Sequence, residues 1–264
     1  MPLVALKDTS IYYERSGLPG GPALLLSNSL GTTMDMWEPQ LEAFRQRYTL
    51  IRYDMRGHGR SSVPTGPYTI EQLGGDVMAL IEALDLSSVA YCGLSIGGLI
   101  GQWLAVNAPE HFRAFIFANT AAKIGNAEGW IQRIATVEQG GLAAIAEGGL
   151  QRWFTPAFRE RASRTAERMR TMLASCNPSG YVSACAALRD TDLRGSIRAI
   201  DAPVCILAGR HDPVTTIEDA RFMQQQIAGS YVVKLPASHI SNVEAPEEFT
   251  TAVLGFLEQQ DSHG

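Results

Sequence analysis

Short apolar segments alternate with longer amphipathic ones along the first half of this chain, and this alternation restricts the fold more than any other feature. Residues 23–27, 49–53, 89–93 and 114–118 are apolar runs bounded by Gly, Asn or Asp, as expected of short buried strands. Strands that alternate with helices favour a mostly parallel sheet joined by right-handed crossovers, with helices on both faces. The predicted class is therefore α/β, and such sheets bind ligands at the carboxyl ends of their strands.

Helical periodicity appears between and after these strands. Apolar residues recur at three- and four-residue intervals from Ile70 to Leu84, and Thr69 with Gln72 matches a capping box. Further strands are expected at 204–208 and 231–235, followed by an amphipathic helix from about 246 to 260.

Between residues 123 and 196 the pattern is helical only, with Trp130, Ile134 and Val137 on one face. We interpret residues 123–196 as an all-helical cap inserted into a core made of residues 1–122 and 197–264, and expect it to cover the strand ends. The pairs Gly140–Gly141 and Gly148–Gly149 are interpreted as helix stops within the cap.

Composition excludes several classes of protein. With 264 residues, 45% hydrophobic content and a net charge of −5, the chain suits one large globular domain or a domain with an insertion. No apolar run approaches the roughly 18 residues of a spanning helix, and the first residues do not resemble a signal peptide. We expect a cytoplasmic protein without membrane contact.

The cysteines and charges suggest neither a metal site nor a nucleic-acid partner. Cys92, Cys176, Cys185 and Cys205 have no zinc or redox spacing, so reduced thiols are expected. Arginines cluster between residues 159 and 170, but glutamates interleave with them, which favours a solvated helix face. The sequence leaves the oligomeric state open.

The strongest local motif is Gly-Leu-Ser-Ile-Gly-Gly at residues 93–98, between a predicted strand and a predicted helix. A serine on so tight a turn needs flanking glycines, because larger side chains would collide with neighbouring backbone. The turn exposes the Ser95 hydroxyl at the sheet edge, beside a helix N-terminus that favours negative charge. The alternative is a glycine-rich packing turn in which the serine is incidental.

A serine nucleophile needs a base, and a carboxylate must orient that base. Of the five histidines, His263 lies in the tail, His111 at the wrong end of the sheet, and His211 directly precedes an acid. His239 follows the predicted strand at 231–235, and Asp212 follows the one at 204–208, so both should lie at the strand carboxyl ends. We predict a triad of Ser95, Asp212 and His239, although Asp212 could instead be a simple turn residue before a proline.

The developing negative charge on an attacked carbonyl oxygen also needs donors. We expect two backbone amides, one from Ile96 after the nucleophile and one from Leu30 in the loop that follows residues 23–27.

These motifs together resemble the α/β-hydrolase superfamily over nearly the whole chain. Asp-Met-Arg-Gly-His-Gly-Arg-Ser at residues 54–61 resembles a structural turn of that family, so His58 is expected to be structural. The loop Asn-Ser-Leu-Gly at 28–31, the extended motif around Ser95, and cap residues including Trp130, Arg133 and Arg152-Trp153-Phe154-Thr155 resemble 3-oxoadipate enol-lactonases.

The resemblance implies a cytoplasmic enzyme of the β-ketoadipate route of aromatic breakdown, which opens an enol-lactone to 3-oxoadipate with no cofactor and no metal. The substrate carboxylate needs a cation, and Arg133, three residues from Trp130, could present charge and aromatic surface together. Equally, Arg133 could be ion-paired on the cap surface, and Trp130 and Trp153 could form the cap's own core.

Other functions stay open at this point. The same fold supports general esterases, carbon–carbon bond hydrolases and cofactor-free perhydrolases, and a ligand-sensing module could keep the pocket without catalysis. Serine at position 95 argues against dehalogenases and epoxide hydrolases, whose nucleophile is aspartate.

Overall fold

The six predicted strands and two further strands near the N-terminus form one eight-stranded sheet in the computed structural model of the protein, which describes residues 2–261. The strands are β1 (Leu3–Ala5), β2 (Ser10–Gly17), β3 (Ala23–Ser27), β4 (Thr49–Tyr53), β5 (Val89–Leu94), β6 (Phe112–Ala118), β7 (Val204–Gly209) and β8 (Tyr231–Leu235). Their spatial order is β1-β2-β4-β3-β5-β6-β7-β8, and all neighbours from β4 to β8 are parallel. The α/β class with a mostly parallel sheet is confirmed.

Two antiparallel strands precede the parallel sheet. β1 pairs with β2, and β2 pairs with β4, so the chain enters the fold along one edge. β3, β4, β5 and β7 are buried along their whole length, as the continuous apolar runs predicted, because helices cover both faces of the sheet.

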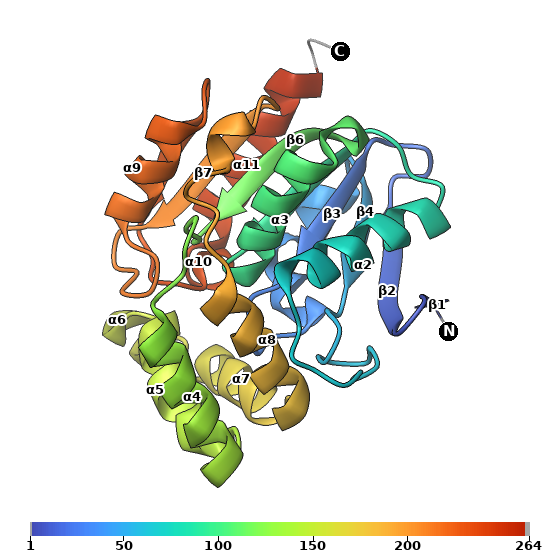
Figure 1. The fold of residues 1–264 in the computed structure, drawn as a ribbon. Coiled ribbons are helices and arrows are strands. Elements are labelled where there is room, and N and C mark those ends of the chain that lie inside the picture. The colour runs from blue at the N-terminus through green and yellow to red at the C-terminus, as the bar shows by residue number, and fades with distance from the viewer. Residues whose placement is uncertain (1, 262–264) are drawn as a thin grey trace.

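Helices flank the sheet on both sides, as Figure 1 shows with α2, α3 and α9 in front and α11 behind. Those of the core are α1 (Leu41–Arg45), α2 (Ile70–Ala83), α3 (Ile96–Asn107), α9 (Ile217–Gln226), α10 (Ser241–Glu244) and α11 (Pro246–Asp261), with 3₁₀ turns η1 (Met34–Gln40), η2 (Pro109–His111) and η3 (Ile197–Ala199). The capping box of Thr69 and Gln72 opens α2 as predicted. In residues 2–261, no helix is both long and apolar enough to cross a membrane.

The helical region that we call the cap lies over the carboxyl ends of the strands, at the lower end of the view in Figure 1. Its helices are α4 (Ala127–Gly140), α5 (Ala143–Trp153), α6 (Pro156–Arg161), α7 (Ser163–Ala174) and α8 (Pro178–Asp190). The charged stretch 159–170 carries a surface ion pair between Glu167 and Arg170.

The two glycine pairs of the cap behave differently. Gly140 ends α4, and Gly141 follows with φ +67° as its cap, so this pair is a helix stop. The same prediction for Gly148 and Gly149 is wrong, because both lie inside α5. Close packing explains the glycine at position 149 better, because a Cβ there would lie 2.7 Å from Leu173 Cδ2.

The loop that follows β4 supports the loop that follows β3. His58 is buried, and its Nε2 accepts a hydrogen bond from the Gly31 amide at 3.1 Å. Its Nδ1 lies 3.2 Å from the Arg56 carbonyl oxygen, which fits a neutral ring that donates from Nδ1. Burial lowers the pKa of His58 to about 4, so the ring stays neutral near pH 7.

This lowered pKa predicts a pH-dependent stability. Between pH 6.5 and 4 the unfolded chain protonates His58 while the folded chain does not, so stability is full above pH 6.5 and is lost as the pH falls through that window. From pH 7.5 to 5.0 this linkage costs about 2 kcal/mol. Urea unfolding of His58→Gln at both pH values should show a pH-dependent loss smaller by that amount, whereas an unchanged loss would contradict the assignment.

Candidate active site

Ser95 stands on a strained turn between β5 and α3. Its backbone has φ +60° and ψ −117°, a region that non-glycine residues rarely occupy. A Cβ on Gly93 would lie 2.2 Å from the Gly97 carbonyl oxygen, and one on Gly97 would lie 2.4 Å from that of Ser27. Both positions therefore require glycine, because a larger side chain would collide with neighbouring backbone, as predicted from the motif.

Ser95, His239 and Asp212 meet at the carboxyl ends of three strands. Ser95 follows β5, Asp212 follows β7 and His239 follows β8. His239 Nε2 lies 2.9 Å from Ser95 Oγ, and His239 Nδ1 lies 2.8 Å from Asp212 Oδ2. All three side chains are buried, so a proton can pass between them without competition from bulk water.

The carboxylate of Asp212 is held by a dense set of donors. Thr215 donates to it from both its amide and its hydroxyl group, and the Val214 amide and Asn119 Nδ2 also donate. Burial alone would raise the pKa of Asp212. The charge of His239 and the hydrogen bonds from His239, Asn119 and Thr215 outweigh burial and hold that pKa below its usual value. Asp212 is therefore ionised at neutral pH and can stabilise a positive imidazole.

Asn119 was missed by the sequence reasoning. It follows β6 with φ +43°, and its Nδ2 donates to both Asp212 and the carbonyl oxygen of Ser238, next to His239. Its Oδ1 accepts from Ser241 at 2.5 Å. A polar residue at a strand end is the only signal that the sequence offers for it.

Two backbone amides belong to residues close to Ser95, since Leu30 lines the same cavity and Ile96 follows Ser95 in the chain. In the loop after β3, the Ser29 amide donates to Met36 and the Gly31 amide to His58, whereas the Leu30 amide between them has no partner within residues 2–261. The amide of Ile96, in the first turn of α3, likewise has none there. Amide donors of this kind suit an oxyanion, and that role of the two residues stays a prediction.

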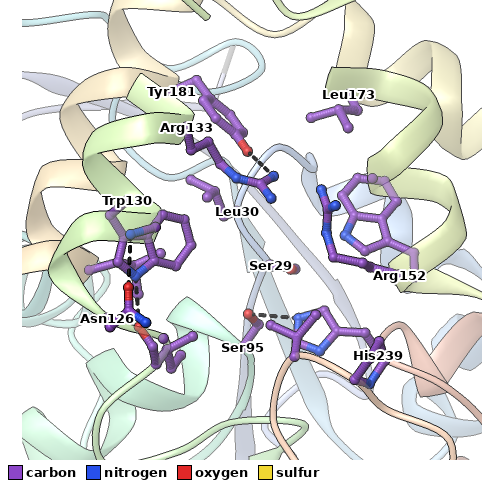
Figure 2. A pocket seen from close by; sticks show the side chains of 18 residues that line it. Ser29, Leu30, Ser95, Asn126, Trp130, Arg133, Arg152, Leu173, Tyr181 and His239 are labelled. Atoms are coloured by element: carbon purple, nitrogen blue, oxygen red, sulfur yellow. Dashed lines mark hydrogen bonds between the residues drawn. The ribbon is translucent and has the colours of Figure 1, made fainter. Parts of the chain in front are cut away.

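A cavity of about 280 Å³ connects these groups with the cap. Its wall includes Ser95, His239, Leu30, Trp130, Arg133, Arg152, Trp153, Tyr181 and Leu173. Figure 2 shows Arg133 and Arg152 reaching into it from the cap, with Ser95 and His239 on the opposite side. Trp130 is half-buried and donates from Nε1 to the Ile124 carbonyl oxygen, while Trp153 is buried in the core as well as lining the cavity.

The two cap arginines that line the cavity, Arg133 and Arg152, have no acidic partner within residues 2–261. Arg133 contacts the Trp130 ring at 5.9 Å, and its Nη1 lies 3.5 Å from Tyr181 Oη. In the part of the chain that the structure describes, neither Arg133 nor Arg152 forms an ion pair. The alternative of an ion-paired Arg133 on the cap surface is therefore wrong.

The loop that carries His239 is tied to the cap. The Ile240 amide donates to the Trp153 carbonyl oxygen at 3.1 Å, and Ser238 Oγ donates to that of Arg152 at 2.9 Å. The buried Glu244 carboxylate accepts from the Ser238 amide at 2.8 Å and from the amide and hydroxyl group of Thr155. The histidine and the cap wall therefore share one hydrogen-bonded junction.

Neither His111 nor His211 lines the cavity. His111 pairs with Glu110 before β6, at the amino end of that strand, and His211 lies outside the residues that line the cavity. His263 lies outside the described residues. Across residues 2–261, no group of His, Cys, Asp or Glu side chains is arranged to hold a metal ion, and all four cysteines are buried free thiols.

The fold and this arrangement agree with known proteins. The family model described as alpha/beta hydrolase fold matches residues 22–246. The chain belongs to the α/β-hydrolase family. This hydrolase is 46% identical to 3-oxoadipate enol-lactonase 2 of Acinetobacter baylyi over 98% of its own length and 99% of that protein. It is 40% identical to 3-oxoadipate enol-lactonase 1 of the same organism over 92% of its length and 91% of that protein.

A solved structure shows the same similarity to the enol-lactonases. The crystal structure of the enol-lactonase from Burkholderia xenovorans LB400 superimposes with a TM-score of 0.96 at 40% identity, covering 97% of this hydrolase and 100% of that chain. The resemblance to the enol-lactonases is confirmed.

The turn around Ser95 can be tested with two glycine substitutions. Gly97→Ala forces a Cβ against the Ser27 carbonyl group and should lower the free energy of unfolding by more than about 3 kcal/mol. The control is Gly75→Ala in α2, where a Cβ meets nothing within 4 Å, and it should raise stability by about 0.5–1 kcal/mol. Denaturant unfolding measures both, and equal effects would contradict the steric account.

Proposed function

We propose that this α/β hydrolase opens the ring of 3-oxoadipate enol-lactone to 3-oxoadipate through an acyl-enzyme intermediate, as a step in the breakdown of aromatic compounds. The observation that carries the proposal is a buried Ser95–His239–Asp212 hydrogen-bond chain that faces a cavity with unpaired guanidinium groups. The full-length similarity to two proteins named 3-oxoadipate enol-lactonase supports this substrate over other esters.

The first half of the reaction forms the acyl-enzyme. His239 accepts the proton of Ser95 Oγ as that oxygen attacks the lactone carbonyl carbon, and Asp212 stabilises the resulting imidazolium. The amides of Leu30 and Ile96 donate to the carbonyl oxygen as it becomes negative. The ring C–O bond then breaks, and its oxygen leaves as an enolate, a far better leaving group than an ordinary alkoxide, which His239 protonates.

The second half releases the product. His239 removes a proton from a water molecule, whose oxygen attacks the ester carbonyl carbon and displaces Ser95 Oγ. The proton returns to Ser95, the new carboxylate leaves, and the enol becomes the ketone. Every proton has a donor and an acceptor in these residues and water, so the scheme needs no cofactor.

Substrate binding is assigned to the cap. The guanidinium group of Arg133 would hold the free carboxylate of the lactone, and Trp130 and Trp153 would pack against the carbon skeleton. A carboxylate is the ligand that an unpaired guanidinium in a partly apolar pocket favours most.

The first test is Ser95→Ala, assayed on the enol-lactone and on p-nitrophenyl esters. Loss of the nucleophile should lower kcat by about 10⁴-fold or more while leaving the fold intact by circular dichroism. The unmodified protein should prefer the enol-lactone. Preference for the simple esters would favour a general esterase, and activity of Ser95→Ala within about tenfold of the parent would remove Ser95 from the chemistry.

The second test addresses recognition of the carboxylate. Arg133→Met should raise KM for the enol-lactone by about tenfold, since a charge-assisted hydrogen bond is lost, with kcat nearly unchanged. KM for a neutral ester of similar size should change less than about twofold. Steady-state kinetics on both substrates measures this, and equal increases would exclude Arg133 from carboxylate binding.

A further inference from the structure

The cavity carries two positive charges and no negative one. Arg133 comes from α4 and Arg152 from the last turn of α5, and both guanidinium groups line the cavity above Ser95 (Figure 2). Among the residues that the structure describes, no acidic one lines the cavity, and the carboxylate of Asp212, behind His239, already accepts hydrogen bonds from its own donors. In an otherwise acidic protein with a net charge of −5, this pairing is unusual.

The structure holds Arg152 in this place at some cost. Burial lowers the pKa of Arg152, and the charge of Arg133 lowers it further, so the charged form of Arg152 is disfavoured when the cavity holds no anion. Gly148, one turn earlier in α5, leaves room for it: a Cβ there would lie 3.3 Å from Arg152 Nη1. The Arg152 carbonyl oxygen is fixed by Ser238, next to His239.

Both arginines are also reached from outside. A groove between α4 and α5 is lined by Arg133 and Arg152 together with small or neutral residues such as Gly129, Ala144 and Gly148. The two side chains therefore form part of the wall between this groove and the active-site cavity. Hydration from the groove makes two like charges tolerable, yet on the cavity side their charge is compensated only by a ligand.

We propose that Arg133 and Arg152 together form a dicarboxylate-binding site, in which Arg133 takes one carboxylate group and Arg152 the second. This inference rests on the proposed function. The enol-lactone has one carboxylate, and opening of its ring creates a second. The ring-opened product then matches the two charges better than the substrate does, so it competes with substrate for the cavity.

The test is direct binding to Ser95→Ala, which cannot hydrolyse an ester ligand. Isothermal titration calorimetry with adipate, monomethyl adipate and dimethyl adipate varies the number of carboxylates from two to none on one carbon skeleton. Adipate should bind about tenfold tighter than its monomethyl ester, and the dimethyl ester should bind weakest. In Ser95→Ala/Arg152→Met, adipate and monomethyl adipate should bind equally.

Two further variants keep this test sharp. Arg152→Lys retains a charge and should restore part of the preference for adipate. Arg164→Met removes an exposed arginine of α7 that lies outside the residues lining the cavity and the groove, so the same loss of net charge should leave the preference unchanged.

An unchanged preference for adipate after Arg152→Met, or no preference in Ser95→Ala itself, would overturn the inference. These outcomes do not depend on turnover. A protein that binds adipate but leaves the enol-lactone intact would refute the proposed function alone, and one that opens the lactone without preferring adipate would refute this inference alone.

Discussion

The site depends on the hydrogen bonds that hold the buried carboxylate of Asp212. Five hydrogen bonds converge on it, from His239, Asn119, Val214 and both donors of Thr215. They keep a charge in the protein interior that burial would otherwise neutralise, and that charge orients the imidazole toward Ser95. The parallel sheet makes this possible, since three strands deliver these residues to one edge although more than a hundred positions separate the serine from the acid.

In the proposed function, the cap gives this general machinery its selectivity for the substrate. In the proposed mechanism, Ser95 and the amides of Leu30 and Ile96 would act on any ester, because they would contact only the reacting carbonyl group. We propose that Arg133 and Arg152, which line the same cavity, respond instead to charge elsewhere on the substrate. The junction at Ser238, Thr155 and Glu244 holds the cap wall and the histidine loop together, so the position of the guanidinium groups and that of the base are linked.

Much of the fold could be predicted because its signals are local. The buried strands are continuous apolar runs, and α2 is recognised by its helical periodicity of apolar residues and its capping box. The motif at residues 93–98 lies between a strand and a helix. The triad followed from topology, since parallel strands end at one edge. The antiparallel strands β1 and β2 were not predicted, because β1 has only three residues and β2, although eight residues long, is mostly half-buried or exposed and carries little apolar periodicity.

What escaped prediction depends on contacts between distant segments. Arg152 looks like any other cap arginine until the structure shows that no acid lies beside it. Gly148 and Gly149 resemble a helix stop in the sequence. In the structure, the side chains of Arg152 and Leu173 lie so close that a Cβ at these two positions would crowd them. Asn119 and Glu244 are single polar residues whose partners lie far along the chain.

The most direct test of the central claim is to trap the acyl-enzyme. The protein is mixed with the enol-lactone, quenched in acid within the first turnover, and its intact mass and peptides are measured by mass spectrometry. If Ser95 is the nucleophile, the mass increases by that of one lactone, the increase is located on the peptide that contains Ser95, and it is absent when the protein is denatured before mixing. An adduct on any other residue, or turnover with no adduct at any quench time, would contradict it.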